Sequence, residues 1–290
     1  MSDSVKLKAF AKINLGLDVI RRRDDGYHEV RMIMQSIRLF DRITMTRNSS
    51  GTIRLSSNLH FLPLKENNLV YQAVKQVREI YSIPDGVDIH LEKHIPISAG
   101  LAGGSSDAAA ILIGMNQLFS LNLPEKRLRE IGLTMGADIP FCIMRGTVLS
   151  EGIGEILTPL PPMPDCFIVI VKPAFSMSTA FVYQNLDLTK IEHPDIDGMI
   201  KALEEQNLSG ITDRMGNVLE QVTATHFPEI VSIREKLIEL GAKNAIMSGS
   251  GSSVFGVFDD ENAAEKAAAH FRGQPDIKLS RTVTAYNRPS

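Results

Sequence analysis

The chain has 290 residues, and its 31 Lys and Arg against 34 Asp and Glu give a formal net charge of −3 with the seven histidines neutral. With 43% hydrophobic and 22% charged residues, it has the composition of a soluble globular protein with enough apolar material for one large or two ordinary domains. The near-neutral balance excludes binding to nucleic acid or anionic lipid through bulk positive charge, but it leaves open a small anionic substrate held in a local site.

The cysteines and the apolar runs indicate the compartment. Cys142 and Cys166 are too few for a disulfide scaffold and belong to no C-x-x-C pair, so we expect two buried thiols in a reducing environment. Lys6, Lys8 and Lys12 interrupt the first apolar stretch, which argues against a signal peptide. No apolar run approaches the roughly 20 residues of a membrane span. We therefore expect a cytoplasmic protein with no membrane partner.

The first predicted element is a strand over residues 5–19, where every odd position is apolar and most even positions are polar. This period of two predicts one buried face, with Lys12 and Asn14 projecting together from the other. A turn signal at residues 25–26 precedes a second strand-like pattern at 29–39. The two segments together predict a long hairpin.

The rest of the first half alternates strands and helices. Residues 106–119 form a predicted helix for which Ser105 or Ser106 is the expected N-cap. The other predicted elements are strands at 51–56, 87–91 and 146–149 and helices at 68–81 and 125–135.

Four prolines within residues 159–164 mark a domain linker or an edge turn. We place a boundary there, between an N-terminal domain at 1–160 and a C-terminal domain at 161–290. The second half contains predicted strands at 166–171, 244–247, 253–258 and 282–286, and helices at 178–186, 196–205, 217–225, 228–240 and 262–271, with Gly241 as the C′ residue of the fourth helix. The pattern is that of an α+β chain in two parts.

A glycine-rich segment at residues 96–110, PISAGLAGGSSDAAA, contains the strongest chemical signal. Its glycines permit close approach of the backbone and positive φ, and the N–H groups at the start of the following helix favour a phosphate. The alternative is an ordinary loop with a good helix cap. The sequence lacks the Gly-Lys pair of a Walker loop and the His-Arg-Asp and Asp-Phe-Gly motifs of protein kinases, and a helix follows where a dinucleotide fold needs a strand.

Three further features are weak when taken singly. A second glycine and serine segment at 247–255 favours a tight turn between strands. Asp138 lies between a helix and Pro140, where the chain is expected to turn and present the carboxylate to a cleft, although most loop aspartates are simply exposed. Lys12, likewise, is by itself typical of a solvated edge lysine.

In combination these features resemble the GHMP kinases. The resemblance is carried by four ordered segments, at 11–15 (AKINL), 96–110, 136–141 (GADIPF) and 248–253 (SGSGSS). The pair KINL and GYHE near the start is similar to members that phosphorylate a cytidine diphosphate-linked methylerythritol in the non-mevalonate route to isoprenoids. The family implies a two-domain α+β fold, with an N-terminal α/β domain, a C-terminal ferredoxin-like domain and the active site in the cleft between them.

The resemblance also implies roles for individual residues. Asp138 matches the catalytic base, and Lys12 matches the lysine that assists it. Asn67 and Lys93 match positions near adenine, with Asn68 beside them. The ATP phosphate cradle corresponds to Pro96, Ile97, Ser98, Ala99, Gly100, Leu101, Ala102, Gly103, Gly104, Ser105 and Ser106.

The resemblance also implies which residues bind the substrate and that a metal ion is present. Asn14 matches a residue that holds the methylerythritol, and Tyr27 and His28 match residues that stack on and hydrogen-bond to cytosine. Either Phe181 or Tyr183 supplies a second aromatic ring, with Phe181 preferred. Mg²⁺ is expected with the ATP, and its protein ligands are open; the candidates are Ser105, Ser106 and Asp107.

Alternatives remain at this stage. Another small-molecule kinase of the family, acting on homoserine or mevalonate, would share most of these segments. A non-catalytic nucleotide-binding protein would keep the cradle without the chemistry, but Lys12 and Asp138 argue against it. An RNA-binding module is disfavoured by the acidic balance. We expect a small-molecule substrate, no nucleic acid and a monomer or weak homodimer.

Overall fold

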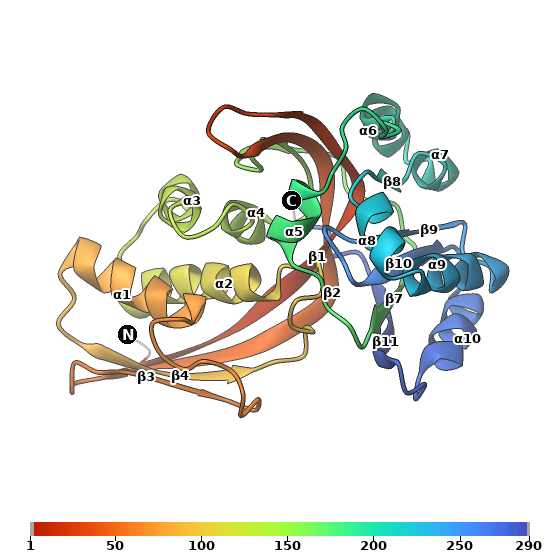
Figure 1. Ribbon diagram of the computed structural model, residues 1–290. Coiled ribbons are helices and arrows are strands. Elements are labelled where there is room, and N and C mark those ends of the chain that lie inside the picture. Colours follow the sequence, from red (N-terminus) through yellow and green to blue (C-terminus); the bar gives the residue numbers. More distant parts are fainter. Residues whose placement is uncertain (1–2, 289–290) are drawn as a thin grey trace. The chain divides into compact units, whose positions relative to one another are not determined.

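Two compact units make up the computed structural model, which describes residues 3–288 (Figure 1). The first unit contains the chain up to Ala11 together with Leu39–Ile97 and Ala102–Met144. The second contains Lys12–Arg38, Ser98–Leu101 and the chain from Arg145 onwards. The units are therefore interleaved along the sequence, and the predicted boundary at residue 160 stays a prediction.

The predicted hairpin is confirmed and is longer than expected. Strand β1 (Ser4–Arg22) lies beside β2 (His28–Asn48), and each contributes residues to both units. The prediction of a single buried face was wrong for the middle of β1, since every residue from 11 to 19 is buried. Gly16 shows why: a Cβ there would lie 2.6 Å from Cδ1 of Ile196, so a distant helix covers the polar face of the strand.

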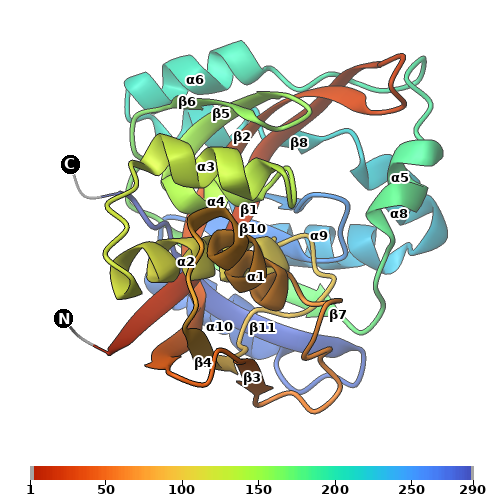
Figure 2. The same ribbon diagram turned by 90° about the vertical axis from the view of Figure 1, so that its left-hand side faces the viewer.

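In the first unit, helices pack on a sheet. Strand β3 (Ile53–Ser57) is parallel to β4 (Gly86–Glu92), which is antiparallel to the second half of β2. Helices α1 (Leu69–Tyr81) and α2 (Gly103–Leu118) pack together, on the same side of β3 and β4 in Figures 1 and 2. Gly114 allows α2 to approach the sheet, since a Cβ would lie 2.3 Å from Sδ of Met45. Helix α3 (Glu125–Leu133) and α4 (Ile139–Met144) pack on α2.

Two helix starts differ from prediction. The expected N-cap of α2 at Ser105 or Ser106 was wrong: the N-cap is Ala102, and the Ser106 N–H already bonds to its carbonyl oxygen at 2.8 Å. Helix α4 was not predicted, because Pro140 was interpreted as a turn. Proline is compatible with the first turn of a helix, where its missing N–H has no intrahelical partner to lose.

In the second unit, a four-stranded antiparallel sheet has the order β11 (Ile277–Thr284), β7 (Phe167–Pro173), β10 (Val254–Phe258), β9 (Asn244–Met247). Helix α9 (Glu229–Glu239) packs on β9 and β10, and α10 (Glu261–Phe271) packs on β7, β10 and β11. The chain order β7, α9, β9, β10, α10, β11 with this strand order is ferredoxin-like, which confirms the predicted fold.

The remaining elements of the second unit lie along the hairpin or between β7 and α9. The first half of β2 pairs with β5 (Thr147–Gly152), which pairs with β6 (Ile156–Pro159), and β1 pairs in parallel with β8 (Gly216–Asn217). The helices are α5 (Thr179–Gln184), α6 (Ile196–Glu204), the unpredicted α7 (Leu208–Thr212) and α8 (Glu220–His226).

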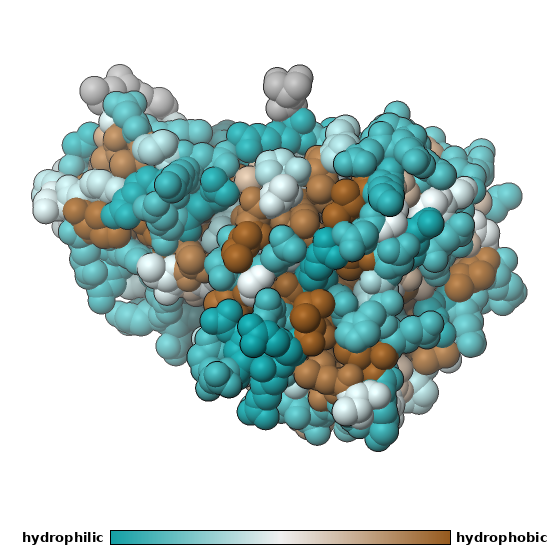
Figure 3. Space-filling view, turned by 90° about the horizontal axis from the view of Figure 1, so that it is seen from above, coloured by the Kyte–Doolittle hydropathy of each residue, from teal (hydrophilic) through white to brown (hydrophobic). Residues whose placement is uncertain are grey.

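The surface is mixed in character. Figure 3 shows a face covered mainly by hydrophilic residues, with hydrophobic ones gathered in patches. Two aromatic side chains are strongly exposed, Tyr27 at 61% and Phe61 at 75%. Within residues 3–288 no helix combines the length and the apolar character that a membrane crossing requires. Both cysteines are buried thiols that form no disulfide with each other, as expected.

Candidate active site

Lys12 is a buried cation in the middle of β1, with only 5% of its surface exposed. Its Nζ donates to Oδ1 of Asn14 at 2.7 Å, and Nδ2 of Asn14 lies 3.2 Å from Sδ of Met32. The reading of Lys12 as a solvated edge lysine was wrong. The spacing of two residues does place both polar side chains on one strand face, as predicted.

The first part of the glycine-rich segment, Ser98–Leu101, belongs to the second unit with Lys12. The Lys12 N–H donates to the carbonyl oxygen of Leu101 at 3.2 Å. Gly100 has φ of +73°, and a Cβ on it would lie 2.0 Å from the carbonyl oxygen of Ser248. Only glycine fits this position, because both the dihedral angle and the close approach exclude a side chain.

The second glycine and serine segment therefore does more than turn the chain between β9 and β10. The Ser248 hydroxyl donates to the carbonyl oxygen of Gly100 at 3.0 Å, and the Ser253 N–H donates to that of Ala99 at 3.2 Å. These contacts join the two glycine-containing loops, of which the second was a weak signal by itself.

In the first unit, the chain enters α2 through Ala102, a non-glycine residue with φ of +54°. Helix α2 has 16 residues, and no side-chain hydrogen bond caps its N-terminus. Such a helix start presents backbone N–H groups and the positive end of the helix dipole, an arrangement that suits an anion. The Ser106 hydroxyl is buried and donates to the carbonyl oxygen of Phe10 at 2.6 Å, whereas Ser105 is half-buried.

Lys93 forms a buried ionic cluster with Asp41 and Asp107. Its Nζ donates to Oδ2 of Asp41 and, at 2.8 Å, to Oδ2 of Asp107. Burial opposes the charge on Lys93, but the carboxylates of Asp107 and Asp41 outweigh it and raise the lysine pKa. Burial also raises the pKa of Asp107 well above its ordinary value.

The adenine positions thus have structural partners of their own. The backbone N–H and carbonyl of Lys93 are both bonded to the Asn58 side chain, at 2.8 and 3.1 Å. Asn68 caps α1 by accepting the Val70 N–H at 2.9 Å. Asn67, just before this cap, is exposed. The structure therefore commits the side chain of Lys93 to the ionic cluster, and its adenine role stays a prediction.

Asp138 is half-buried and directly precedes α4 in the first unit. Its carbonyl oxygen accepts the Cys142 N–H at 3.1 Å, which closes the first turn of that helix. Asp138 thus lies at the start of this helix. The pairing of Asp138 with Lys12 stays a prediction.

Aromatic side chains of the second unit gather near the β1–β2 turn. Tyr27 lies in that turn, and its N–H donates to Asp25 Oδ1 at 3.0 Å. The rings of His28 and Tyr183 are 5.2 Å apart between centroids, with an angle of 41° between their planes. Phe181 instead makes an edge contact with His226 at 5.1 Å. Partial burial, and to a lesser extent Arg22, lowers the pKa of His28, which favours the neutral form of its ring.

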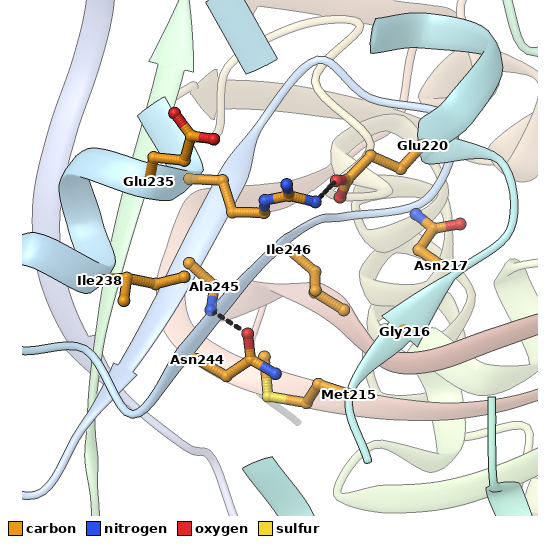
Figure 4. Close-up of a pocket in the computed structure, with 10 residues that line it drawn as sticks. Met215, Gly216, Asn217, Glu220, Glu235, Ile238, Asn244, Ala245 and Ile246 are labelled. Atoms are coloured by element: carbon orange, nitrogen blue, oxygen red, sulfur yellow. Dashed lines mark hydrogen bonds and ion pairs between the residues drawn. The ribbon is translucent and has the colours of Figure 1, made fainter. Parts of the chain in front are cut away.

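Sequence reasoning missed two residues behind the second loop. Nδ2 of Asn217 donates to the carbonyl oxygens of Met247 and Gly249, and Glu220 accepts the Met247 N–H at 2.7 Å. Both line a pocket of 340 Å³, in which Glu220 is paired with Arg234 (Figure 4). The only available signal was their position, with Asn217 shortly before α8 and Glu220 at its first residue, which carries no chemical meaning by itself.

Comparisons with known proteins bear on this arrangement. Residues 68–146 match the GHMP kinases N terminal domain, and residues 184–276 match the GHMP kinases C terminal domain. A 4-diphosphocytidyl-2-C-methyl-D-erythritol kinase from Lachnoclostridium phytofermentans is 53% identical over 274 residues, 94% of each chain. The chain belongs to the GHMP kinase family, among the 4-diphosphocytidyl-2-C-methyl-D-erythritol kinases.

Solved structures of GHMP kinases agree with this assignment. A crystal structure of a 4-(cytidine 5'-diphospho)-2C-methyl-D-erythritol kinase has a TM-score of 0.84 at 32% identity, and the alignment covers 98% of this chain and all of that one. A homoserine kinase from Cytophaga hutchinsonii has a TM-score of 0.80 at 20% identity, over 99% and 96% of the chains. This second likeness concerns the fold alone. The two matched domains fall on either side of residue 160.

Proposed function

We propose that this chain transfers the γ-phosphoryl group of ATP to the 2-hydroxyl of 4-diphosphocytidyl-2-C-methyl-D-erythritol. The products are the 2-phosphate and ADP, and the reaction serves the non-mevalonate route to isoprenoid precursors. The identity of 53% with a kinase of that name, over 94% of both chains, carries the proposal. The geometry around Lys12 and the two joined loops is consistent with it.

In the proposed mechanism Asp138 accepts the proton of the 2-hydroxyl, a tertiary alcohol that is a poor nucleophile when protonated. Lys12 keeps the aspartate ionised and stabilises the developing alkoxide. A general base of this kind contributes about 10²–10⁴-fold to the rate. Placing the hydroxyl in line with the γ-phosphoryl group supplies much of the remainder. Burial of Lys12 supports its role, since its charge is poorly screened by water there.

The ATP phosphates are assigned to the segment from Pro96 to Ser106, with the start of α2 supplying backbone N–H groups. Asn67 and Lys93 are proposed to lie near the adenine. Mg²⁺ would neutralise phosphate charge when bound. Of its candidate ligands, Ser106 donates its hydroxyl to Phe10, whereas Asp107 has a buried Oδ1 without a hydrogen-bond partner beside the Oδ2 that pairs with Lys93, so Ser105 and Asp107 both stay candidates. Magnesium commonly keeps several waters, which suits so few protein ligands.

The cytidine end is assigned to the aromatic group of the second unit. Tyr27 is exposed enough to stack on cytosine, and neutral His28 can donate to or accept from its edge. The contact between His28 and Tyr183 favours Tyr183 over Phe181 as the second ring, in contrast to the preference drawn from sequence. Asn14, bonded to Lys12, is proposed to hold the methylerythritol near the reacting hydroxyl.

A coupled assay of ADP release tests this function. Purified protein with ATP, Mg²⁺ and the cytidyl substrate should release ADP in proportion to substrate. Homoserine or mevalonate in its place should give only the background rate. Release with either of these, or none with the cytidyl substrate, would contradict the proposal.

A further inference from the structure

The loop of residues 248–253, between β9 and β10, is a centre of polar contacts in the second unit. Its four serines are all buried, with exposures of 7% or less. Gly249 has φ of +57°, and a Cβ on it would lie 3.2 Å from the Gly100 carbonyl oxygen and 3.4 Å from Nζ of Lys12. The position of Gly249 therefore determines the space beside both Lys12 and Gly100.

Asn217 holds this loop from behind. The side-chain amide has two N–H groups, and both serve the loop: one donates to the Met247 carbonyl oxygen at 2.8 Å and one to that of Gly249 at 2.7 Å. Its Oδ1 accepts the Leu219 N–H at 3.0 Å. The polar atoms of the amide are thus satisfied by this geometry, and a side chain that lacks two donors cannot reproduce it.

The position of Asn217 is itself set by the strand that carries Lys12. Strand β8 pairs in parallel with β1, with Asn217 opposite Leu17, and the Val218 N–H donates to the Leu17 carbonyl oxygen at 3.1 Å. Lys12 lies five residues earlier on the same strand. Asn217 is therefore connected to Lys12 in two ways, along β1 through the pairing with Leu17 and through Gly249, which lies beside Nζ of Lys12.

Glu220 supports the same loop from α8. Its Oε2 accepts the Met247 N–H at 2.7 Å, and its Oε1 accepts from Arg234 at 2.7 Å. Asn217 and Glu220 thus hold the carbonyl and the N–H of one residue, Met247, at the point where β9 ends. This double anchor fixes where the loop begins.

We propose that Asn217 is a positioning residue for phosphoryl transfer. By fixing Gly249 it sets the place of Lys12 and of the Gly100 turn in the phosphate cradle. The inference rests on the proposed function, because it assigns Lys12 and Gly100 their roles in that reaction. Misplacing a reacting group by about 1 Å can cost about 100-fold in rate.

The variant Asn217→Asp tests the proposal, because it keeps the shape and replaces both donors with an acceptor that faces two carbonyl oxygens. We expect kcat to fall about 10- to 100-fold. The KM for the cytidyl substrate should stay within about twofold, because Tyr27 and His28 are untouched. The affinity for a fluorescent ADP analogue should also fall, by about fivefold or more.

The variant Asn116→Asp is a matched control. Nδ2 of Asn116, near the end of α2 in the first unit, donates to the carbonyl oxygen of Leu123 in the following loop at 3.1 Å, and its Oδ1 accepts the Leu123 N–H at 2.9 Å. Asn116→Asp should lower the Tm about as much as Asn217→Asp does, yet keep kcat and the affinity for the ADP analogue within about twofold of wild type. A role of Asn217 in stability alone would give the two variants the same kinetics.

Two further variants keep the proposal testable if Asn217→Asp does not fold. Asn217→Ala and Gly249→Ala should each lower kcat, and their combination should cost less than the product of the single losses, because both act through one loop. Any folded Asn217 variant with wild-type kcat and ADP affinity overturns the inference, as does equal loss in Asn116→Asp. If the wild-type protein binds the ADP analogue but forms no ADP from ATP and the cytidyl substrate, the kinase function is overturned instead. The affinities of the variants for the ADP analogue then still decide the role of Asn217.

Discussion

Nζ of Lys12 and Oδ1 of Asn14 are joined by a 2.7 Å hydrogen bond, and neither residue is more than 5% exposed. A buried ammonium needs such a partner, because an unpaired charge in a poorly hydrated site is strongly disfavoured. Asn14 therefore supplies a hydrogen-bond acceptor for the buried ammonium and fixes the direction of the Lys12 side chain. The pair joins the residue proposed to hold the methylerythritol to the proposed catalytic lysine.

Replacing Asn14 with leucine removes the acceptor at nearly constant volume. We expect a loss of about 1–3 kcal/mol in the free energy of unfolding, the usual cost of leaving a buried donor unsatisfied. We also expect kcat to fall by at least about tenfold. Urea denaturation and steady-state kinetics measure the two effects. Wild-type stability in Asn14→Leu would show that Lys12 finds another partner.

Asp138→Asn tests the proposed base without changing its shape. We expect kcat to fall by about 10²–10⁴-fold while the Kd for ATP stays near the wild-type value, because the base acts only on the hydroxyl proton. The control is Asp213→Asn at the exposed C-cap of α7, which should keep full activity. A rate near wild type for Asp138→Asn would remove this residue from the mechanism.

The choice between Phe181 and Tyr183 is open to a matched pair of substitutions. Stacking of a base on an aromatic ring is worth about 1–3 kcal/mol, so Tyr183→Leu should raise the KM for the cytidyl substrate by about 5- to 150-fold. Phe181→Leu, on the same helix, should change it by less than about threefold. The reverse pattern would restore Phe181 as the cytosine contact.

The stability of the protein should depend on Lys172 in mildly alkaline solution. Burial, with a smaller effect of Lys278, lowers the pKa of Lys172 to about 8, against 10.5 for an ordinary lysine. Between these values the unfolded chain binds the proton that the folded chain has released, so the free energy of unfolding rises with pH. Urea denaturation from pH 7 to 10.5 should show that the free energy of unfolding of the wild type, minus that of Lys172→Met, increases across this window. A constant difference would contradict the lowered pKa.

The sequence predicted most elements, because their signals are local. Alternation over residues 5–19 predicted β1 and placed Lys12 and Asn14 on one face, since a strand repeats every two residues. Apolar spacing predicted a helix at 68–81, and the structure has α1 at 69–81 with Asn68 as its N-cap. The ferredoxin-like order of the second unit, by contrast, followed from the family resemblance.

The rest depends on contacts between segments that are far apart in the chain. The face of β1 at Gly16 is covered by α6, about 180 residues further along the chain, and periodicity cannot reveal such a contact. Lys93 was assigned to the adenine site because it matches a family position. Its pairing with Asp41 could not be foreseen, because Asp41 lies 52 residues earlier in the chain. Pro140 is compatible with a loop and with the first turn of a helix, and only the packing of α4 on α2 decides between the two.

The contact between Gly100 and Ser248 has a consequence for the catalytic cycle. Since a single added methyl group would collide with the carbonyl oxygen there, the two loops have no room to slide past each other. Any motion that admits ATP or releases ADP must carry both loops as one rigid piece or leave both in place. These two loops of the proposed phosphate cradle are thus already assembled before nucleotide arrives. The entropic cost of ordering them falls on folding and not on each turnover.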